Sequence, residues 1–292
     1  DERAGLKGAQ NKMITRILPP TDAAIAEAAA LIRAGELVAF PTETVYGLGA
    51  DGLNREAVAK IFQAKGRPGD NPLILHISAL DQIAPLIACE LSPVAKKMAD
   101  AFWPGPLTMI FPKSARVPEN VSAGLSTVAI RFPAHPDAQR LIAAAETPIA
   151  APSANRSGKP SPTTANHVFE DMDGRIPLIL DGGECLVGVE STVVDMTGPV
   201  PHILRPGGIT AEQIAQVAGA SEVDSAVMRP LAEGEKPRSP GMAHRHYAPN
   251  GQLTVFTGDS DRVIQRIQSE YDCAKANGSR PLILSMEAHV AS

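Results

Sequence analysis

The chain has 292 residues, of which 44% are hydrophobic and 20% are charged, and its formal net charge at pH 7 is −5. This composition excludes a disordered or low-complexity protein and provides enough apolar residues for one large domain and a small second one. The acidic balance argues against a protein that grips nucleic acid over its whole surface, so any anion site must be local.

The folded part is expected to begin near Met13, after the polar residues 1–12. Apolar periodicity and capping residues predict helices at 22–34, 54–65, 136–145 and 210–217, and another that opens at Ser92-Pro93. The predicted strands cover residues 37–40, 73–77, 107–111, 127–131, 149–151, 178–181, 192–195 and 202–204. Because the last three strands follow one another without a helix, we expect an α/β fold with a mixed parallel and antiparallel sheet and helices packed on it.

Residues 221–250 differ in composition from the rest, being rich in Glu, Pro, Arg and Ser. Such a composition is typical of a flexible linker. Beyond it, residues 253–256, 259–271 and 281–284 are predicted as strand, helix and strand, a single unit that is marginal for independent folding. The expected organisation is a large domain at 13–220, a linker at 221–250 and a small unit at 251–292.

One glycine pattern, GLGADG at 47–52, matches the GxGxxG fingerprint of dinucleotide-binding enzymes. That fingerprint needs a tight turn directly at a strand end, whereas six residues separate the predicted strand 37–40 from Gly47. The acidic residue that should close a second strand about 20 positions on is here Asp70, in a loop after a helix. A nicotinamide or flavin enzyme is therefore the weaker interpretation.

Neither the cysteines nor the apolar runs point to a disulfide framework, a zinc site or a membrane. Cys89, Cys185 and Cys273 are scattered without a CxxC pair, and His244 with His246 lacks a third metal ligand. The longest apolar runs are strand-sized and fall far short of the ~20 residues that cross a bilayer. Since no secretory leader is recognisable, a cytoplasmic location is expected.

Five short segments combine glycine, hydroxyl-bearing and cationic residues near predicted strand ends. They are PTETVYGLG (41–49), KGRPGDNP (65–72) running into His76, Ser126-Thr127 with Arg131, PSAN (152–155) followed by SGKPS (157–161), and EST (190–192) followed by RPGG (205–208). Lysine and arginine suit carboxylates and phosphates, and glycine lets the backbone approach an anion closely. No Ser-His-Asp or Cys-His arrangement stands at a familiar spacing, which favours catalysis by positioning and electrostatic stabilisation.

Each of these residues also has a purely structural interpretation when it is taken alone. Thr44 could hydrogen-bond its own turn, and Lys65 with Arg67 could form a solvated helix end. His76 could be a core histidine, and Arg131 could belong to a surface ion pair. The functional interpretation therefore rests on the joint occurrence of the segments.

Six ordered motifs resemble the YrdC-like family of threonylcarbamoyl-AMP synthases in its longer, two-domain form. They are PTETVYGLG, KGRP with NPL and a following histidine, PSAN with SGKPSPT, ESTVVD, ILRPG, and a tail that runs from SPGM to RHYAP. The resemblance covers about residues 13–249 and departs from the family pattern at Ala243-His244, where a lysine and a tyrosine are expected. It implies a YrdC-like twisted mixed sheet with flanking helices, followed by a partial Rossmann-like C-terminal unit.

The resemblance also implies a role for each matching residue. The threonine pocket would be lined by Thr44, His76, Arg131, Ala151 (through its backbone) and Ser191, with Arg131 on the substrate carboxylate. The ATP site would be formed by Lys65, Arg67, Asn71, Thr127, Ser153, Asn155, Ser161 and Arg205. The linker residues Arg245, His246 and Tyr247 would close over the nucleotide as a lid.

The implied reaction joins L-threonine, bicarbonate and ATP into threonylcarbamoyl-adenylate and pyrophosphate, and the adenylate is the intermediate for t6A modification of tRNA. Mg²⁺ is expected to arrive with ATP, because no carboxylate cage is visible in the sequence. A tRNA threonylcarbamoyl-transferase machinery would receive the product, with weak direct binding of tRNA or double-stranded RNA. Two other classes compete: an RNA-binding module without chemistry, and a carbamoyl-transfer enzyme similar to a domain of hydrogenase-maturation proteins.

Overall fold

The computed structural model describes residues 13–227 and 252–284. The chain divides into two compact units, Asp1–Ala248 and Pro249–Ser292. Most of the predicted linker, including Arg245, His246 and Tyr247, lies outside the described residues. Within the described ranges, no helix combines the length and apolar character needed to cross a bilayer.

Eleven strands of residues 13–227 form one sheet in the order β1-β8-β2-β3-β7-β4-β6-β5-β9-β10-β11. Their bounds are β1 (Arg16–Leu18), β2 (Val38–Phe40), β3 (Gly47–Asp51), β4 (Ile74–His76), β5 (Leu107–Pro112), β6 (Thr127–Arg131), β7 (Ile149–Ala150), β8 (Leu178–Leu180), β9 (Thr192–Asp195), β10 (His202–Arg205) and β11 (Glu222–Val223). The sheet contains parallel pairs such as β4–β6 and β5–β9 and antiparallel pairs such as β3–β7 and β5–β6. The predicted mixed sheet is therefore confirmed.

The α-helices of the first unit include all those predicted, each of which begins within one residue of its expected start. They are α1 (Asp22–Arg33), α2 (Arg55–Lys65), α3 (Pro93–Phe102), α4 (Glu119–Ser122), α5 (Pro136–Ala145), α6 (Ala165–Met172) and α7 (Ala211–Ala218). The Asn54 side chain accepts hydrogen bonds from the first turn of α2, and Gly66 ends that helix with φ 62°. Local signals of this kind explain the agreement, whereas the short α4 and α6 were not predicted.

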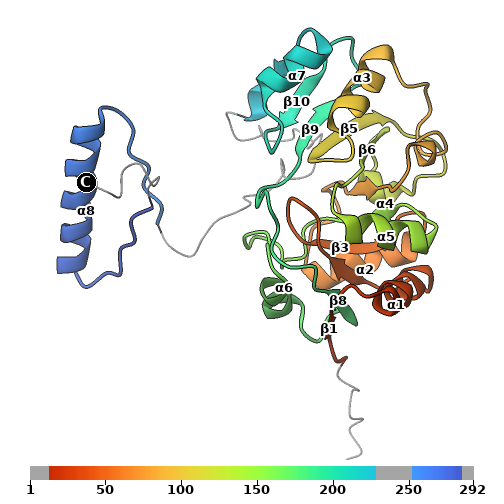
Figure 1. The fold of residues 1–292 in the computed structure, drawn as a ribbon, viewed down its shortest axis with the longest axis horizontal. Coiled ribbons are helices and arrows are strands. Elements are labelled where there is room, and N and C mark those ends of the chain that lie inside the picture. Colours follow the sequence, from red (N-terminus) through yellow and green to blue (C-terminus); the bar gives the residue numbers. More distant parts are fainter. Residues whose placement is uncertain (1–12, 228–251, 285–292) are drawn as a thin grey trace, which may run out of the picture. The chain divides into compact units, whose positions relative to one another are not determined.

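Helices cover both faces of the sheet (Figure 1). Successive side chains of a strand point to opposite faces, so Val38 and Phe40 pack with α1 and α5, while Ala39 belongs to the larger core under α2, α3, α6 and α7. The same alternation in β4 sends Leu75 into the larger core and leaves Ile74 and His76 on the other face. That second face carries the pocket described below.

The glycine pattern at 47–52 is a strand and not a phosphate-binding turn. It was not among the predicted strands, but its residues Gly47–Asp51 form β3, which pairs antiparallel with β2 and β7. A Cβ at Gly49 would lie 2.8 Å from side-chain atoms of Phe40 and Ile149, and one at Gly52 would lie 2.5 Å from Leu75. These glycines therefore allow close packing, which accounts for the GxGxxG match without a dinucleotide.

The second unit contains α8 (Ser260–Ala276), which begins as predicted and runs five residues beyond the predicted end. The predicted strands at 253–256 and 281–284 were wrong, because neither segment forms a strand in the described residues. Leu253, Val255, Leu282 and Leu284 are exposed. An extended segment becomes a strand only when its N–H and C=O groups are paired, and the described part of this unit offers these segments no such partner.

Candidate active site

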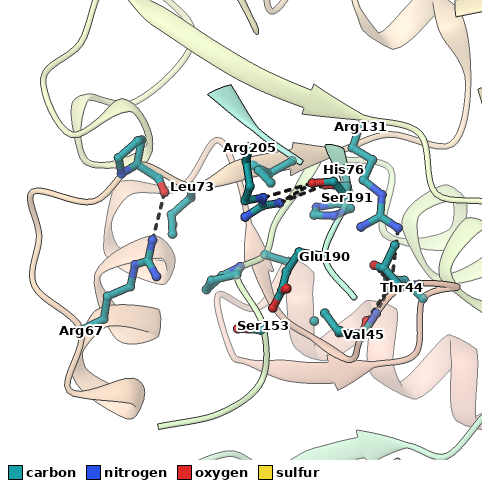
Figure 2. Close-up of a pocket in the computed structure, with 16 residues that line it drawn as sticks. Thr44, Val45, Arg67, Leu73, His76, Arg131, Ser153, Glu190, Ser191 and Arg205 are labelled. Carbon is teal, nitrogen blue, oxygen red and sulfur yellow. Dashed lines mark hydrogen bonds between the residues drawn. The ribbon is translucent and has the colours of Figure 1, made fainter. Parts of the chain in front are cut away.

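A pocket in the first unit gathers side chains from segments far apart in the chain (Figure 2). It is lined by Thr42, Thr44, Val45, Gly47, Arg67, Pro72, Leu73, Ile74, His76, Arg131, Ala151, Pro152, Ser153, Glu190, Ser191 and Arg205. All five residues predicted for the threonine pocket are among them, as are Arg67, Ser153 and Arg205 of the predicted ATP site. The pocket thus combines three arginines with hydroxyl groups and one carboxylate.

Strand register brings the central residues together. β4 and β6 run parallel with His76 opposite Arg131, so both side chains stand at the same end of the sheet. β7 is antiparallel to β4 with Ile149 opposite His76, and Ala151 follows at the end of β7. The pairing therefore brings three segments that are far apart in the chain onto one face of the sheet, with Arg131 beside His76 and Ala151 beside Ile74, to whose carbonyl its N–H donates at 3.0 Å.

Arg131 forms a buried ion pair behind the pocket. Its Nη2 donates to Glu43 Oε1 at 2.7 Å, and the two side chains are only 5% and 9% exposed. The Ala134 N–H donates to the other Glu43 oxygen at 3.0 Å, and Arg131 Nε points to the Gly105 carbonyl at 3.4 Å. The pair is buried and not on the surface, and Glu43, which carried no predicted role, holds the guanidinium in one orientation.

The loop between β2 and β3 shapes the same end of the pocket. Thr42 Oγ1 donates to the Val45 carbonyl at 2.6 Å and lies 2.9 Å from Thr44 Oγ1. Both threonines are buried and both line the pocket. Thr44 therefore serves its own turn and faces the pocket at once, so the structural and functional interpretations of this residue are compatible.

Arg205 and Ser191 form a second hydrogen-bonded group. Arg205 Nε and Nη2 donate to the Ser191 carbonyl at 3.1 and 2.9 Å, and Nη2 lies 3.1 Å from Ser191 Oγ. Ser191 Oγ is also 2.7 Å from the hydroxyl of Thr108, a fully buried residue of β5 that the sequence did not single out. These contacts fix the Ser191 hydroxyl at the wall of the pocket.

Lys65 lies under the loop 153–155 and is not among the lining residues. Its Nζ donates to the carbonyls of Ser153 and Asn155, and the side chain is 3% exposed. Burial and the neighbouring Arg67 charge lower the pKa of Lys65 well below its usual range. The structure gives Lys65 a role in shaping the loop that carries Ser153, and its contact with ATP stays a prediction.

The other residues predicted for ATP, Asn71, Thr127, Asn155 and Ser161, are not among those that line the pocket. Asn71 is fully buried before β4, with both polar atoms of its amide unpaired among the described residues, and Thr127 begins β6. The Asn155 amide donates to the carbonyls of Arg156 and Lys159 at 2.9 and 2.7 Å. Ser161 donates to the carboxylate of Glu190, which does line the pocket.

His76 is held neutral at the pocket wall. Burial and, next, the charge of Arg131 lower its pKa to about 3. The imidazole is 3% exposed and meets Phe40 edge-on, with the ring centroids 6.2 Å apart. His76 is thus both buried and in contact with the pocket, so neither of the two predicted interpretations excludes the other.

The neutral state of His76 predicts that the protein becomes less stable as the pH falls below about 6.5. Below pH 6.5 the unfolded chain protonates this imidazole while the folded protein does not until about pH 3, so the free energy of unfolding falls as the pH falls through that window. When the pH is lowered from about 7.5 to about 4.5, the free energy of unfolding should fall in the wild type. In His76→Asn this fall should be smaller by about 2–3 kcal/mol. Urea unfolding of both proteins at the two pH values measures this difference, with His167→Asn, a change at an exposed histidine, as the control. An equal fall in the free energy of unfolding in all three proteins would contradict the prediction.

Among the described residues, no group of three His, Cys, Asp or Glu side chains is arranged to hold a metal ion. His244 and His246 lie outside the described residues. Cys185 is buried, and burial raises the pKa of its thiol to about 11. The pocket therefore offers cations, hydroxyls and a single carboxylate as its chemical groups.

Comparisons with known families agree with this arrangement. The profile of the Sua5/YciO/YrdC family, described as telomere recombination, matches residues 30–207. A second profile, described as the C-terminal domain of threonylcarbamoyl-AMP synthase, matches residues 209–291. Together the two profiles account for most of the chain.

Individual relatives are similar over nearly the whole chain. A threonylcarbamoyl-AMP synthase of Pyrococcus abyssi is 51% identical over 253 residues, which are 87% of this chain and 74% of the relative. One of Bacillus subtilis is 50% identical over 275 residues, 94% of this chain and 77% of the relative. The crystal structure of P. abyssi Sua5 complexed with L-threonine superposes with a TM-score of 0.84 at 49% identity, covering 91% of this chain and 77% of that one.

Proposed function

The chain belongs to the Sua5/YciO/YrdC family, in the two-domain form of the threonylcarbamoyl-AMP synthases, and from this premise we propose that its pocket joins L-threonine, bicarbonate and ATP into threonylcarbamoyl-adenylate and pyrophosphate. The observation that carries the proposal is that Arg67, Arg131 and Arg205 meet in one pocket with Ser153 and Ser191. The adenylate is the activated intermediate for t6A modification of tRNA, which a downstream transferase machinery completes.

The amino-acid end of the site is proposed at Arg131. A buried guanidinium is a strong partner for a carboxylate, and Glu43 holds this one in place at the pocket wall. Thr44, Ser191 and the neutral His76 provide hydrogen-bonding groups without adding charge beside it. A small zwitterion with a hydroxyl group, such as L-threonine, suits this set.

The ATP end is proposed at Arg67, Arg205 and Ser153. Figure 2 places Arg67 on the opposite side of the pocket from Arg131, so an anion held there lies across from the amino acid. The predicted roles of Asn71, Thr127, Asn155 and Ser161, and of Arg245, His246 and Tyr247 in the linker, extend this part of the proposal.

In the proposed reaction the threonine nitrogen first takes up bicarbonate and forms a carbamate. A carbamate oxygen then attacks the α-phosphorus of ATP, and the bond from that phosphorus to the pyrophosphate oxygen breaks. Negative charge grows on the leaving pyrophosphate, so cations fixed beforehand at that position lower the barrier. Since the described residues form no carboxylate cage, the proposal has Mg²⁺ enter with the ATP phosphates.

The test is a reaction of the purified chain with ATP, bicarbonate and labelled L-threonine. Pyrophosphate release is expected only when both threonine and bicarbonate are present, with the label appearing in an adenylate. Release that ignores threonine would contradict the proposal. Turnover of carbamoyl phosphate would favour a carbamoyl-transfer enzyme, and steeply salt-dependent RNA binding without turnover would favour a binding module.

A further inference from the structure

Glu190 is the one acidic residue among those that line the pocket. The charged and titratable groups that share the pocket with it are Arg67, Arg131, Arg205 and His76. Glu43 is also close, but its carboxylate is engaged behind Arg131. If this pocket holds the positive end of a zwitterion, Glu190 is the one anionic group that the described lining residues offer it.

The Glu190 carboxylate is held by its surroundings. Ser161 Oγ donates to Oε1, and within residues 13–227 and 252–284 this is its one hydrogen bond, with no ion pair. The backbone is fixed as well, because Arg205 donates to the next carbonyl at Ser191 and the chain at Gly207 passes so close that a Cβ there would lie 2.3 Å from the Glu190 carbonyl. One carboxylate oxygen is thus anchored, and the other remains for a ligand.

Glu190 also lies between the two ends of the pocket. In the view of Figure 2 the Glu190 carboxylate lies with Arg67 on one side and Arg131 with Thr44 on the other, and all four residues line the pocket. If Arg131 holds the substrate carboxylate and Arg67 the phosphates, the α-amino group lies in the space between them. The position of Glu190 therefore matches the group that must react.

We propose that Glu190 binds the α-ammonium group of the amino-acid substrate and accepts a proton from it as the nitrogen attacks bicarbonate. The inference rests on the proposed function. The ammonium gives one proton to the carboxylate, and its freed electron pair forms the N–C bond. Bicarbonate loses hydroxide, which takes a second proton from the nitrogen and leaves as water, so the products are the carbamate, water and a protonated Glu190.

A base is needed because an α-ammonium group, with a pKa of about 8 at a peptide terminus and a higher one in a free amino acid beside its own carboxylate, is mostly protonated near pH 7 and cannot attack carbon. His76 is a poor candidate because burial lowers its pKa to about 3, and the threonine and serine hydroxyls are far weaker bases than a carboxylate. Among the lining residues Glu190 is the group that combines charge, position and basicity.

The first experiment measures binding by calorimetry without ATP. Glu190→Gln is compared with the wild type and with Glu184→Gln, which removes an exposed carboxylate from the same loop. Loss of a charged hydrogen bond should weaken L-threonine binding about 10- to 100-fold in Glu190→Gln and leave Glu184→Gln unchanged. Binding of 2,3-dihydroxybutanoate, in which a hydroxyl replaces the ammonium, should be unaffected in all three proteins.

The second experiment measures synthesis against pH. The wild type should vary little between about pH 6.5 and pH 8, whereas Glu190→Gln should be slower by about 10²–10⁴ and gain about tenfold per pH unit, because only the free amine reacts there. Glu190→Asp, which keeps a carboxylate, should recover the flat profile. Unfolding midpoints equal to the wild type establish that the variants are folded.

Two results would overturn the inference. One is that Glu190→Gln binds threonine in preference to dihydroxybutanoate as strongly as the wild type does, and that its rate of synthesis has the same pH dependence. The other is a normal threonine affinity with a defect that high Mg²⁺ repairs, which would make Glu190 a metal ligand. If the wild type itself shows no threonine-dependent pyrophosphate release, the proposed function fails, while the calorimetry still tests whether Glu190 binds the ammonium.

Discussion

Arg67→Ala is expected to lower the rate of threonylcarbamoyl-adenylate synthesis by about 10²–10³ without unfolding the protein. Arg67 follows α2 directly and lines the pocket, and its Nη2 donates to the Pro72 carbonyl at 3.2 Å. This hydrogen bond holds the guanidinium in position in the pocket before the substrate binds. Its removal should therefore act on turnover more than on the affinity for threonine at the other end of the pocket.

The measurement is steady-state pyrophosphate release at saturating L-threonine, ATP and bicarbonate. Arg55→Ala is the matched control, because Arg55 is exposed at the other end of the same helix and does not line the pocket. Arg67→Lys should recover only part of the rate, since a point charge replaces a planar fork of donors. Turnover of Arg67→Ala equal to that of Arg55→Ala would remove Arg67 from the nucleotide site.

Glu43→Ala is expected to reduce the free energy of unfolding by about 3–5 kcal/mol and to weaken threonine binding. The substitution leaves the Arg131 guanidinium buried with no carboxylate at 2.7 Å, and an unpaired buried charge is far more costly than an unpaired exposed one. The same change frees Arg131 to take other orientations, so its contact with a substrate carboxylate should weaken as well.

Urea unfolding and threonine calorimetry of three variants test this expectation. Glu27→Ala breaks the exposed Arg16–Glu27 pair and should cost no more than about 1 kcal/mol. The double variant Glu43→Leu with Arg131→Met removes both buried charges, so it should recover most of the stability lost in Glu43→Ala while binding no threonine. A Glu43→Ala protein as stable as Glu27→Ala would show that the buried pair does not have the proposed importance.

The agreement between sequence and structure is best where the signals are local. Asn54 and Gly66 mark the ends of α2 through hydrogen bonds and a backbone conformation within a few residues of each end. Ser92 with Pro93 opens α3 for the same reason. The sequence also pointed to the segments that line the pocket, because glycine, hydroxyl and cationic residues recur in them near strand ends.

The failures come from interactions that no local pattern encodes. The segment that forms β3 shows no alternation of apolar and polar residues, and its Gly49 is needed because Phe40 and Ile149 approach closely from other strands. The segments at 253–256 and 281–284 have the composition of strands, yet composition cannot provide a pairing partner. Glu43 was passed over because its ion pair joins residues 88 positions apart.

The sequence by itself determined the positions of the main helices, the chemical character of five loops and, through six ordered motifs, the family. Only the tertiary structure decided that Lys65 turns toward the 153–155 loop, that Arg131 is paired with Glu43, and that Glu190 is the one carboxylate among the described residues of the pocket. The physical reason is the distance along the chain over which each interaction acts. Caps and turns depend on neighbours within a few residues, whereas the direction of a buried charge depends on strand register and on which distant polar group satisfies it.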